Sequence, residues 1–166
     1  MISTLAPQSK SIHPLARFVT KEAIALILNV PVEKIREIRC WARVILVVGQ
    51  NLSRFVSYAD LPPVVGVEEP ISSDFAYWRK RWKKLKIKQA PDIWATFYAN
   101  RFGQARDIAE LFSWGQLLGI IKNSLSEQAI VALRSIYIAE KLFLETQVNN
   151  ASLSLNYPNQ RAASLA

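Results

Sequence analysis

The sequence contains a single cysteine, Cys40, and a single histidine, His13. One cysteine cannot form a disulfide within the chain, so we expect a reducing, cytoplasmic setting. A histidine-based metal site needs further histidine or cysteine ligands, and a Cys/His triad would have to use this one histidine, which lies in the expected tail. The five glycines are dispersed and form no loop that would cradle a phosphate. We therefore expect no enzymatic activity, no metal and no cofactor.

The chain also lacks long apolar runs. No stretch reaches about 18 uninterrupted apolar residues, and Pro7 to Lys10 interrupt the N-terminus, so we expect neither a transmembrane helix nor a secretory signal. Yet 51% of the residues are hydrophobic and mean hydropathy is +0.10, which is high for a chain with a formal charge of +8. This apolar surplus must lie in a core or in an interface. The length of 166 residues suits one domain or two small units that share a core.

The C-terminal part of the sequence lacks net charge. Residues 91–166 carry six Lys/Arg and six Asp/Glu, whereas residues 1–66 carry eight and four, and residues 67–90 carry seven and three. This split predicts a basic portion that faces a partner and a neutral portion that packs.

The densest positive charge lies between Arg79 and Lys88, where seven of ten residues are Lys or Arg and none is acidic. Such a run is either a solvated helix face or a contact for a polyanion: nucleic acid, an acidic protein or, less favoured, an anionic membrane surface. Trp78 and Trp82 share a helical stripe with Phe75 and Leu85. That spacing favours core anchors over platforms for stacking bases.

Capping and turn signals predict an α+β fold that is mainly helical. We expect a flexible tail over 1–17, an α+β unit over 18–66, a linker and basic amphipathic helix over 67–90, a helical bundle over 91–148 and a disordered tail over 149–166. Within the unit, Thr20 caps a helix over 21–28, Pro31 opens a second helix to Trp41, and residues 44–58 form a β-hairpin.

This helix–break–helix–hairpin order resembles the winged helix-turn-helix of the excisionase and MerR type. The resemblance covers Thr20 to Leu61. It implies that the second helix enters the major groove of DNA, with Lys34, Arg36 and Arg39 on or near it and Arg54 on the wing. The alternative is a small α+β unit whose hairpin only completes a core.

Three smaller features favour packing over chemistry. Cys40 lies among arginines, but we expect it to be inert and buried beside Trp41. Asp107 and Glu110 lie near a predicted helix N-terminus, where negative charge is favoured without any catalytic role. Gly115 and Gly119 are four apart, which permits close helix approach and gives weak support to a homodimer.

The sequence thus predicts a cytoplasmic, non-enzymatic nucleic-acid-binding protein, with DNA favoured over RNA because of the winged-helix resemblance. The expected contacts are the basic residues of the two segments: Lys34, Arg36, Arg39, Arg43, Arg54, Arg79, Lys80, Arg81, Lys83, Lys84, Lys86 and Lys88. The alternative is an adaptor or assembly factor that docks on an acidic partner protein. Its apolar anchors would be Trp94, Tyr98 and Trp114.

Overall fold

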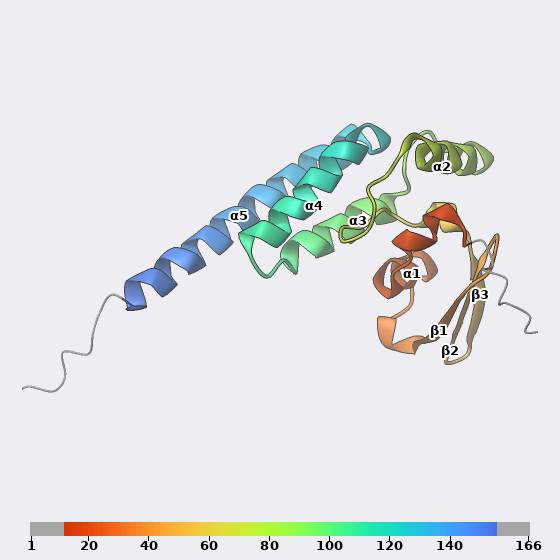
Figure 1. Cartoon of the computed structure of the whole chain (residues 1–166), viewed down its shortest axis with the longest axis horizontal. Helices are drawn as coiled ribbons and strands as arrows, with labels where there is room; N and C mark the ends of the chain where they lie inside the picture. The colour runs from red at the N-terminus through yellow and green to blue at the C-terminus, as the bar shows by residue number, and fades with distance from the viewer. Residues whose placement is uncertain (1–11, 156–166) are drawn as a thin grey trace, which may run out of the picture.

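The structure is a computed structural model that describes residues 12–155. It is mainly helical with one small antiparallel sheet, in the order α1 (Lys21–Leu28), β1 (Ile35–Cys40), β2 (Ile45–Gly49), β3 (Leu52–Val56), α2 (Ser72–Lys84), α3 (Asp92–Gly103), α4 (Ile108–Ile121) and α5 (Glu127–Leu155). Figure 1 shows α1 and the sheet at one end, α2 above the sheet, and α5 running out to the opposite end. The expected class, α+β and mainly α, is confirmed at this level.

Helix α1 forms where the capping signals predict it. The Thr20 hydroxyl accepts a hydrogen bond from the Ala23 amide at 3.2 Å, which satisfies one of the free N–H groups of the first turn. Asn29 ends the helix in the left-handed region with φ 53°, and Pro31 then prevents its continuation. Ile24 points into the core and is fully buried.

The predicted second helix is wrong. Residues Val32–Lys34 form one 3-10 turn, and Ile35–Cys40 form strand β1, paired antiparallel with β2. Ile35 and Ile38 are three apart, which suggested a helix. A β-bulge between Ile35 and Glu37 adds one residue to the strand, so both isoleucines lie on the same face. The helix expected to read the major groove is therefore absent.

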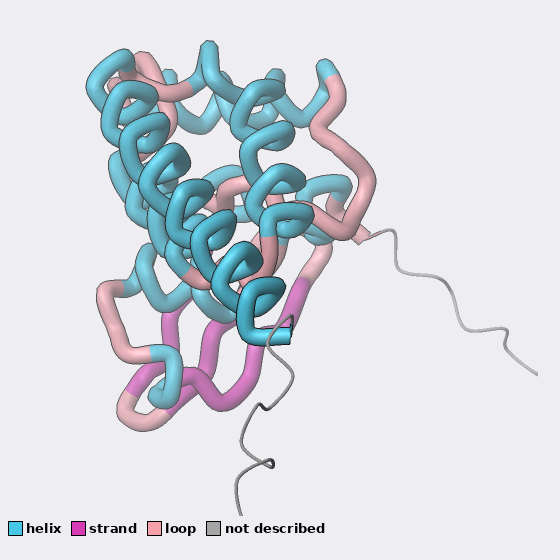
Figure 2. The backbone as a smooth tube through the Cα atoms, turned by 90° about the vertical axis from the view of Figure 1, so that its left-hand side faces the viewer, coloured by secondary structure: helices cyan, strands magenta, loops and turns pink. Residues whose placement is uncertain are grey.

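The hairpin is confirmed, with β2 and β3 joined by a turn in which Asn51 has φ 51°. The sheet order is β1-β2-β3, so β2 is the central strand and pairs with β3 on one edge and with β1 on the other. Ile45, Val47 and Val56 are buried on the face turned to α1. Figure 2 shows the strands gathered together at one end of the helical layers.

The expected flexible tail is wrong for its last residues. Pro14–Phe18 form a 3-10 helix, and Leu15 and Phe18 have no exposed surface. Their apolar side chains join the same core as α1 and α2. Residues 1–11 lie outside the described part of the chain.

Helices α3, α4 and α5 form the predicted helical portion. Tyr137 of α5 crosses Gly115 of α4 so closely that a Cβ atom there would lie 2.7 Å from the tyrosine ring. The helical bundle was expected to end at residue 148, but α5 continues to Leu155, so residues 149–155 are helical and not a disordered tail. Residues 156–166 lie outside the described range. Within residues 12–155, no helix has the length and apolar character needed to cross a membrane.

Candidate nucleic-acid interface

A buried ion pair fixes the N-terminal end of α2. The Asp74 carboxylate has no exposed surface and receives Arg17 Nη2 at 2.5 Å and Nη1 at 3.2 Å. It also accepts a hydrogen bond from the Ile71 amide at 2.8 Å. Arg17 in turn donates to the carbonyls of Glu68 and Glu69, at 3.0 and 3.1 Å. One arginine thus ties the N-terminal 3-10 helix, the linker and α2 together.

A second ion pair holds the basic end of the same helix. Arg81 Nε and Nη2 donate to the two carboxylate oxygens of Asp60 at 2.8 and 3.0 Å. Hydrogen bonding to Asp60 raises the pKa of Arg81 above its ordinary value. Arg81 was expected to contact a polyanion, but its guanidinium already donates two hydrogen bonds to Asp60.

Trp78 and Trp82 are core anchors, as their spacing predicted. Trp78 is fully buried and Trp82 is 4% exposed, and both rings meet Trp94 edge to face, with centroids 5.3 and 5.6 Å apart. The Trp94 indole nitrogen donates to the Asp60 carbonyl at 3.1 Å. The basic helix is therefore a packed element with one side in the core and the other free.

The free side carries Arg79, Lys80, Lys83 and Lys84, which we call the basic face. All four are exposed, and none has an ion-pair partner within residues 12–155. At 100° per residue they fall within an arc of about 140°. Lys86 and Lys88 follow in the exposed connection to α3. The basic face is an uncompensated positive stripe that can hold phosphates.

A row of aromatic rings runs from the outer face of the sheet to α2; it consists of Phe55, Trp41, Tyr58, His13 and Tyr77. Phe55 and Trp41 are 62% and 47% exposed, with ring centroids 5.7 Å apart. The Tyr58 hydroxyl donates to the Trp41 carbonyl at 2.5 Å. His13 stacks on Tyr58 at 4.5 Å and meets Tyr77 of α2 at 5.0 Å. This aromatic row ends beside Lys80 and Lys84, which follow Tyr77 by one and two helical turns.

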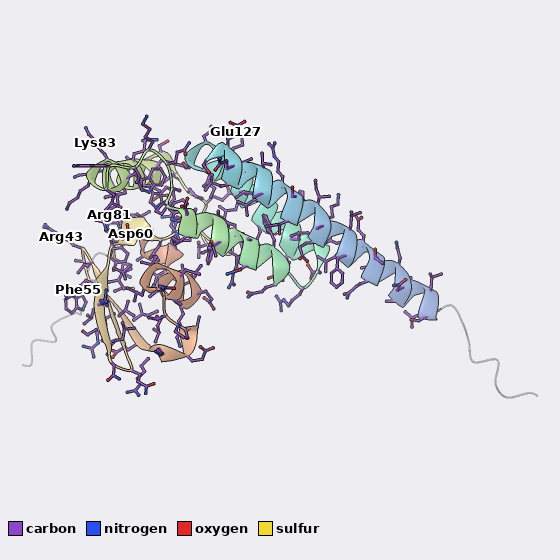
Figure 3. The ribbon with its side chains drawn as sticks, turned by 180° about the vertical axis from the view of Figure 1, so that it is seen from behind. Arg43, Phe55, Asp60, Arg81, Lys83 and Glu127 are labelled. Atoms are coloured by element: carbon purple, nitrogen blue, oxygen red, sulfur yellow. The ribbon has the colours of Figure 1, made fainter. Side chains whose placement is uncertain are left out.

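The sheet splits the arginines that were expected to act together. Arg43 lies exposed in the β1–β2 turn, at the end of the sheet nearest α2, and Figure 3 shows it on the same side of the molecule as Phe55 and Lys83. Lys34 and Arg36 lie at the opposite end of β1. Arg54 pairs with Val47, so it lies on the other face from Phe55.

Arg39 lies on the outer sheet face with Leu46 and Phe55, its neighbours across the strands. It already donates to Glu37, at 2.7 and 3.0 Å. The Arg39–Glu37 ion pair is neutral, so it adds no net positive charge to this face, although both side chains are about half exposed. Of the sheet arginines, Arg43 is the one that adds an unpaired cation next to the aromatic row.

The anchors of the adaptor hypothesis are wrong because they form the core. Trp94 and Tyr98 have no exposed surface and Trp114 is 6% exposed. The Tyr98 hydroxyl donates to the Pro63 carbonyl at 2.8 Å, and burial raises the pKa of this tyrosine well above its ordinary value. None of the three can reach a partner without unfolding the bundle.

Two smaller expectations have opposite outcomes. Cys40 and Trp41 are exposed, so the prediction of buried packing is wrong: at the end of β1 they lie beyond the cover of α1. Tyr58 is buried next to Cys40, and this burial raises the pKa of Tyr58 to about 12.

Asp107 caps α4, as expected, by accepting a hydrogen bond from the Glu110 amide at 2.7 Å, while the Glu110 carboxylate binds Arg106. Among the described residues, no group of three or more His, Cys, Asp or Glu is placed to hold a metal.

Sequence reasoning missed the aromatic row. Phe55 alternates with buried Val56 along β3, which signals an outward aromatic, but Trp41 was assigned to a helix and His13 to a tail. Only the pairing of β1 with β2 brings Trp41 beside Phe55. Comparison of the chain with protein-family models, with curated proteins and with solved structures finds no match.

Proposed function

We propose that this protein is a non-enzymatic nucleic-acid-binding protein that holds a single-stranded segment across the aromatic row, with the basic face of α2 holding its phosphates. The observation that carries this proposal is the exposed Trp41–Phe55 pair, joined through Tyr58 and His13 to Tyr77 on the basic helix. Its exposed members, Phe55, Trp41 and Tyr77, offer stacking surfaces, and Tyr77 lies on the same helix as the cations of the basic face.

Single strands fit this surface better than a duplex. Unpaired bases can stack on aromatic rings, and antiparallel sheet faces with exposed aromatics are a recurring platform for them. A duplex hides the faces of its bases, and the helix that would have entered its major groove is a strand. The preference for DNA over RNA rested on that helix, so RNA and single-stranded DNA are now equal candidates.

Positive charge would supply much of the affinity. Arg79, Lys80, Lys83, Lys84 and Arg43 are exposed and lack ion-pair partners within residues 12–155. Each phosphate neutralised on a single strand contributes about −0.7 to the slope of log affinity against log salt. Four contacts therefore give a slope of about −3. Stacking adds about 1–3 kcal/mol per base, and this part persists at higher salt.

Fluorescence anisotropy tests the stacking step. We expect labelled oligouridylate and oligothymidylate to bind more tightly than a DNA duplex at the same salt. Phe55→Ala should weaken single-strand binding roughly tenfold, because one base loses its platform. The matched control is Phe143→Ala, which removes a phenylalanine of similar exposure from α5, 57% against 62% for Phe55. Equal affinity for duplex and single strand, or equal effects of the two variants, would refute a stacking platform.

Charge reversal tests the second step. Lys83→Glu should weaken binding and flatten its salt dependence, whereas Lys21→Glu, an equal charge change on α1, should have a smaller effect. Poly-glutamate is the third ligand. If it binds as tightly as the oligonucleotides, the surface recognises acidic protein, which is the alternative function. Absence of binding to any nucleic acid at low salt would overturn the proposal.

A further inference from the structure

The end of the molecule farthest from the basic face carries exposed apolar side chains in a neutral setting. Figure 1 shows α5 extending beyond α4, and its last buried residue is Leu144. Every residue from Thr146 to Leu155 is exposed. With 29 residues α5 is about 43 Å long, so about a third of it projects without support from the rest of the fold.

The projecting segment 146–155 has an apolar stripe of its own. Val148, Ala151, Ser152 and Leu155 are spaced so that they share one side of the helix. This is the same side as Ile130, Tyr137 and Leu144, which precede Ala151 at intervals of seven. In the first half of α5 that side is covered by α3 and α4. In the projecting segment this side is exposed, with Val148 57% and Leu155 85% exposed.

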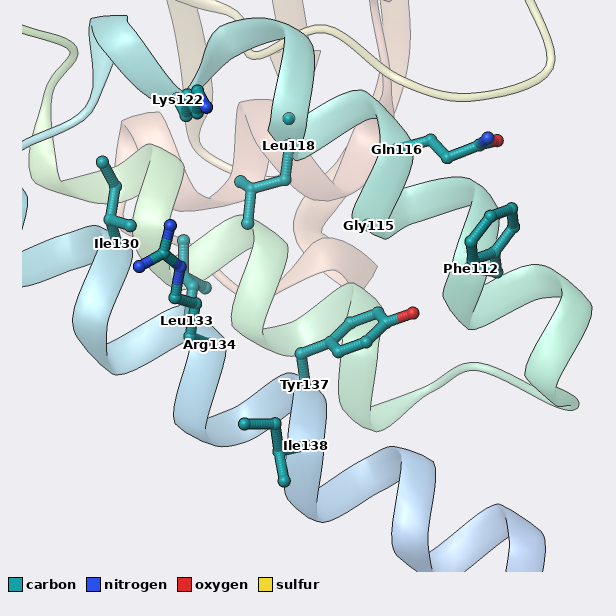
Figure 4. A pocket seen from close by; sticks show the side chains of 11 residues that line it. Phe112, Gly115, Gln116, Leu118, Lys122, Ile130, Leu133, Arg134, Tyr137 and Ile138 are labelled. Atoms are coloured by element: carbon teal, nitrogen blue, oxygen red, sulfur yellow. The ribbon is translucent and has the colours of Figure 1, made fainter.

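A groove between α4 and α5 offers a complementary surface. Its volume is 390 Å³, and its lining includes Gly115, Leu118, Gly119, Ile130 and Tyr137. Figure 4 shows Phe112 and Ile138 toward one end of the groove and Lys122 and Ile130 toward the other, with Arg134 between Ile130 and Tyr137. A Cβ atom on Gly119 would meet nothing within 4 Å, so the α4 wall is flat there and allows close approach of a helix.

We propose that two copies of this chain pair antiparallel through α5, so that the projecting segment of each copy fills the α4–α5 groove of the other. This arrangement is self-complementary about a two-fold axis, because the groove and its occupant belong to the same chain. It covers at once the two apolar surfaces that residues 12–155 leave exposed.

Charge supports a second copy as the occupant. In the antiparallel register that sets Arg134 of one copy opposite Glu145 of the other, Val131 lies opposite Val148, both exposed valines. Arg134 has no ion-pair partner within residues 12–155, and Glu145 has only Lys141, at 3.9 Å. Residues 91–166 carry equal numbers of acidic and basic side chains, so two copies do not repel each other. The basic faces remain at the outer ends.

Light scattering and sedimentation of the full chain test the pairing, and we expect a dimer over a wide concentration range. Gly119→Phe should fill the groove and raise the dimer dissociation constant roughly tenfold or more, without loss of helicity. The matched control is Gly103→Phe, since a Cβ there meets only a Glu140 oxygen at 3.9 Å and lies outside the groove. A chain that ends at Gln147 should also be monomeric.

The register has its own test. Arg134→Glu and Glu145→Arg should each weaken the dimer, and the double variant should restore it. A wild-type chain that stays monomeric at every concentration overturns the proposal. A dimer whose dissociation constant is unchanged by Gly119→Phe also overturns it. If the monomer instead floats with lipid vesicles and Gly119→Phe abolishes flotation, the groove serves a membrane surface and not a second copy. None of these measurements involves nucleic acid, so the pairing and the proposed function succeed or fail separately.

Discussion

The two ends of the molecule are stabilised in different ways. At the sheet end, buried or half-buried polar groups join segments that are far apart in sequence: Arg17 with Asp74, and Arg81 with Asp60. At the α5 end, helices pack through close backbone approach and apolar side chains, as at Gly115 and Tyr137. Within residues 12–155, the sheet end presents exposed, unpaired cations on α2, whereas the α5 end presents exposed apolar side chains. The difference predicts that one end binds polyanions and the other binds apolar helices.

The largest effect should come from the buried ion pair. Asp74→Ala leaves Arg17 without its partner and removes the acceptor of the Ile71 amide, which should cost about 3 kcal/mol or more in unfolding free energy. Urea denaturation measures it. Glu37→Ala, which removes the exposed pair with Arg39, should cost much less, because water screens that pair. Similar losses in the two variants would mean that Asp74 contributes no more than a surface charge.

At the helical end, stability should depend on how closely α4 and α5 approach each other and not on charge. Gly115→Ala forces a Cβ to within 2.7 Å of the Tyr137 ring and should cost about 1–3 kcal/mol. Gly119→Ala meets open space, and alanine favours helix over glycine by about 1 kcal/mol, so this variant should be stabilised. Thermal unfolding of the two variants measures the difference. If both changes have the same sign, α4 and α5 do not cross at Gly115 as closely as described.

Acid should weaken the sheet end more than the helical end. Burial between Tyr58 and Tyr77 lowers the pKa of His13 below 6.5, against the attraction of Asp74, and Nδ1 accepts a hydrogen bond from Leu15. The unfolded chain therefore binds a proton more readily. This contribution to stability is complete above pH 6.5 and is lost as the pH falls toward the lowered pKa. The melting temperature of His13→Gln should fall less than that of the wild type between about pH 7.5 and about pH 5.5.

The smallest effect on stability should come from the lysines of the basic face. Replacing Lys80, Lys83 and Lys84 with Gln should change the unfolding free energy by less than about 0.5 kcal/mol per residue, because they have no ion-pair partner within residues 12–155. A modest gain is consistent with relief of repulsion along α2. A large loss would show that the basic face contributes to the fold, and its role in binding would need another test.

Local signals predicted much of this fold, because α1, β2 and the hairpin turn are specified by their own cap, turn residues and β-branched run. They failed where tertiary contacts decide. Ile35 and Ile38 have helical spacing, and only the pairing with β2 and the bulge make that segment a strand. The basic face was visible in sequence because it belongs to a cluster of seven cations between Arg79 and Lys88. The aromatic row was not, because its rings come from segments separated by up to 64 positions, from His13 to Tyr77.

The hydrogen bonds of Arg17 have a consequence for how the chain is made. Arg17 bonds to residues 51, 52 and 57 positions later, and Asp60 binds the indole of Trp94, 34 positions later. During synthesis α1 and the sheet emerge from the ribosome before α2 and α3. Leu15 and Phe18 then have no complete core to enter. The sheet end cannot reach its final packing until about residue 98 has emerged, so a chain truncated near residue 66 should remain unfolded.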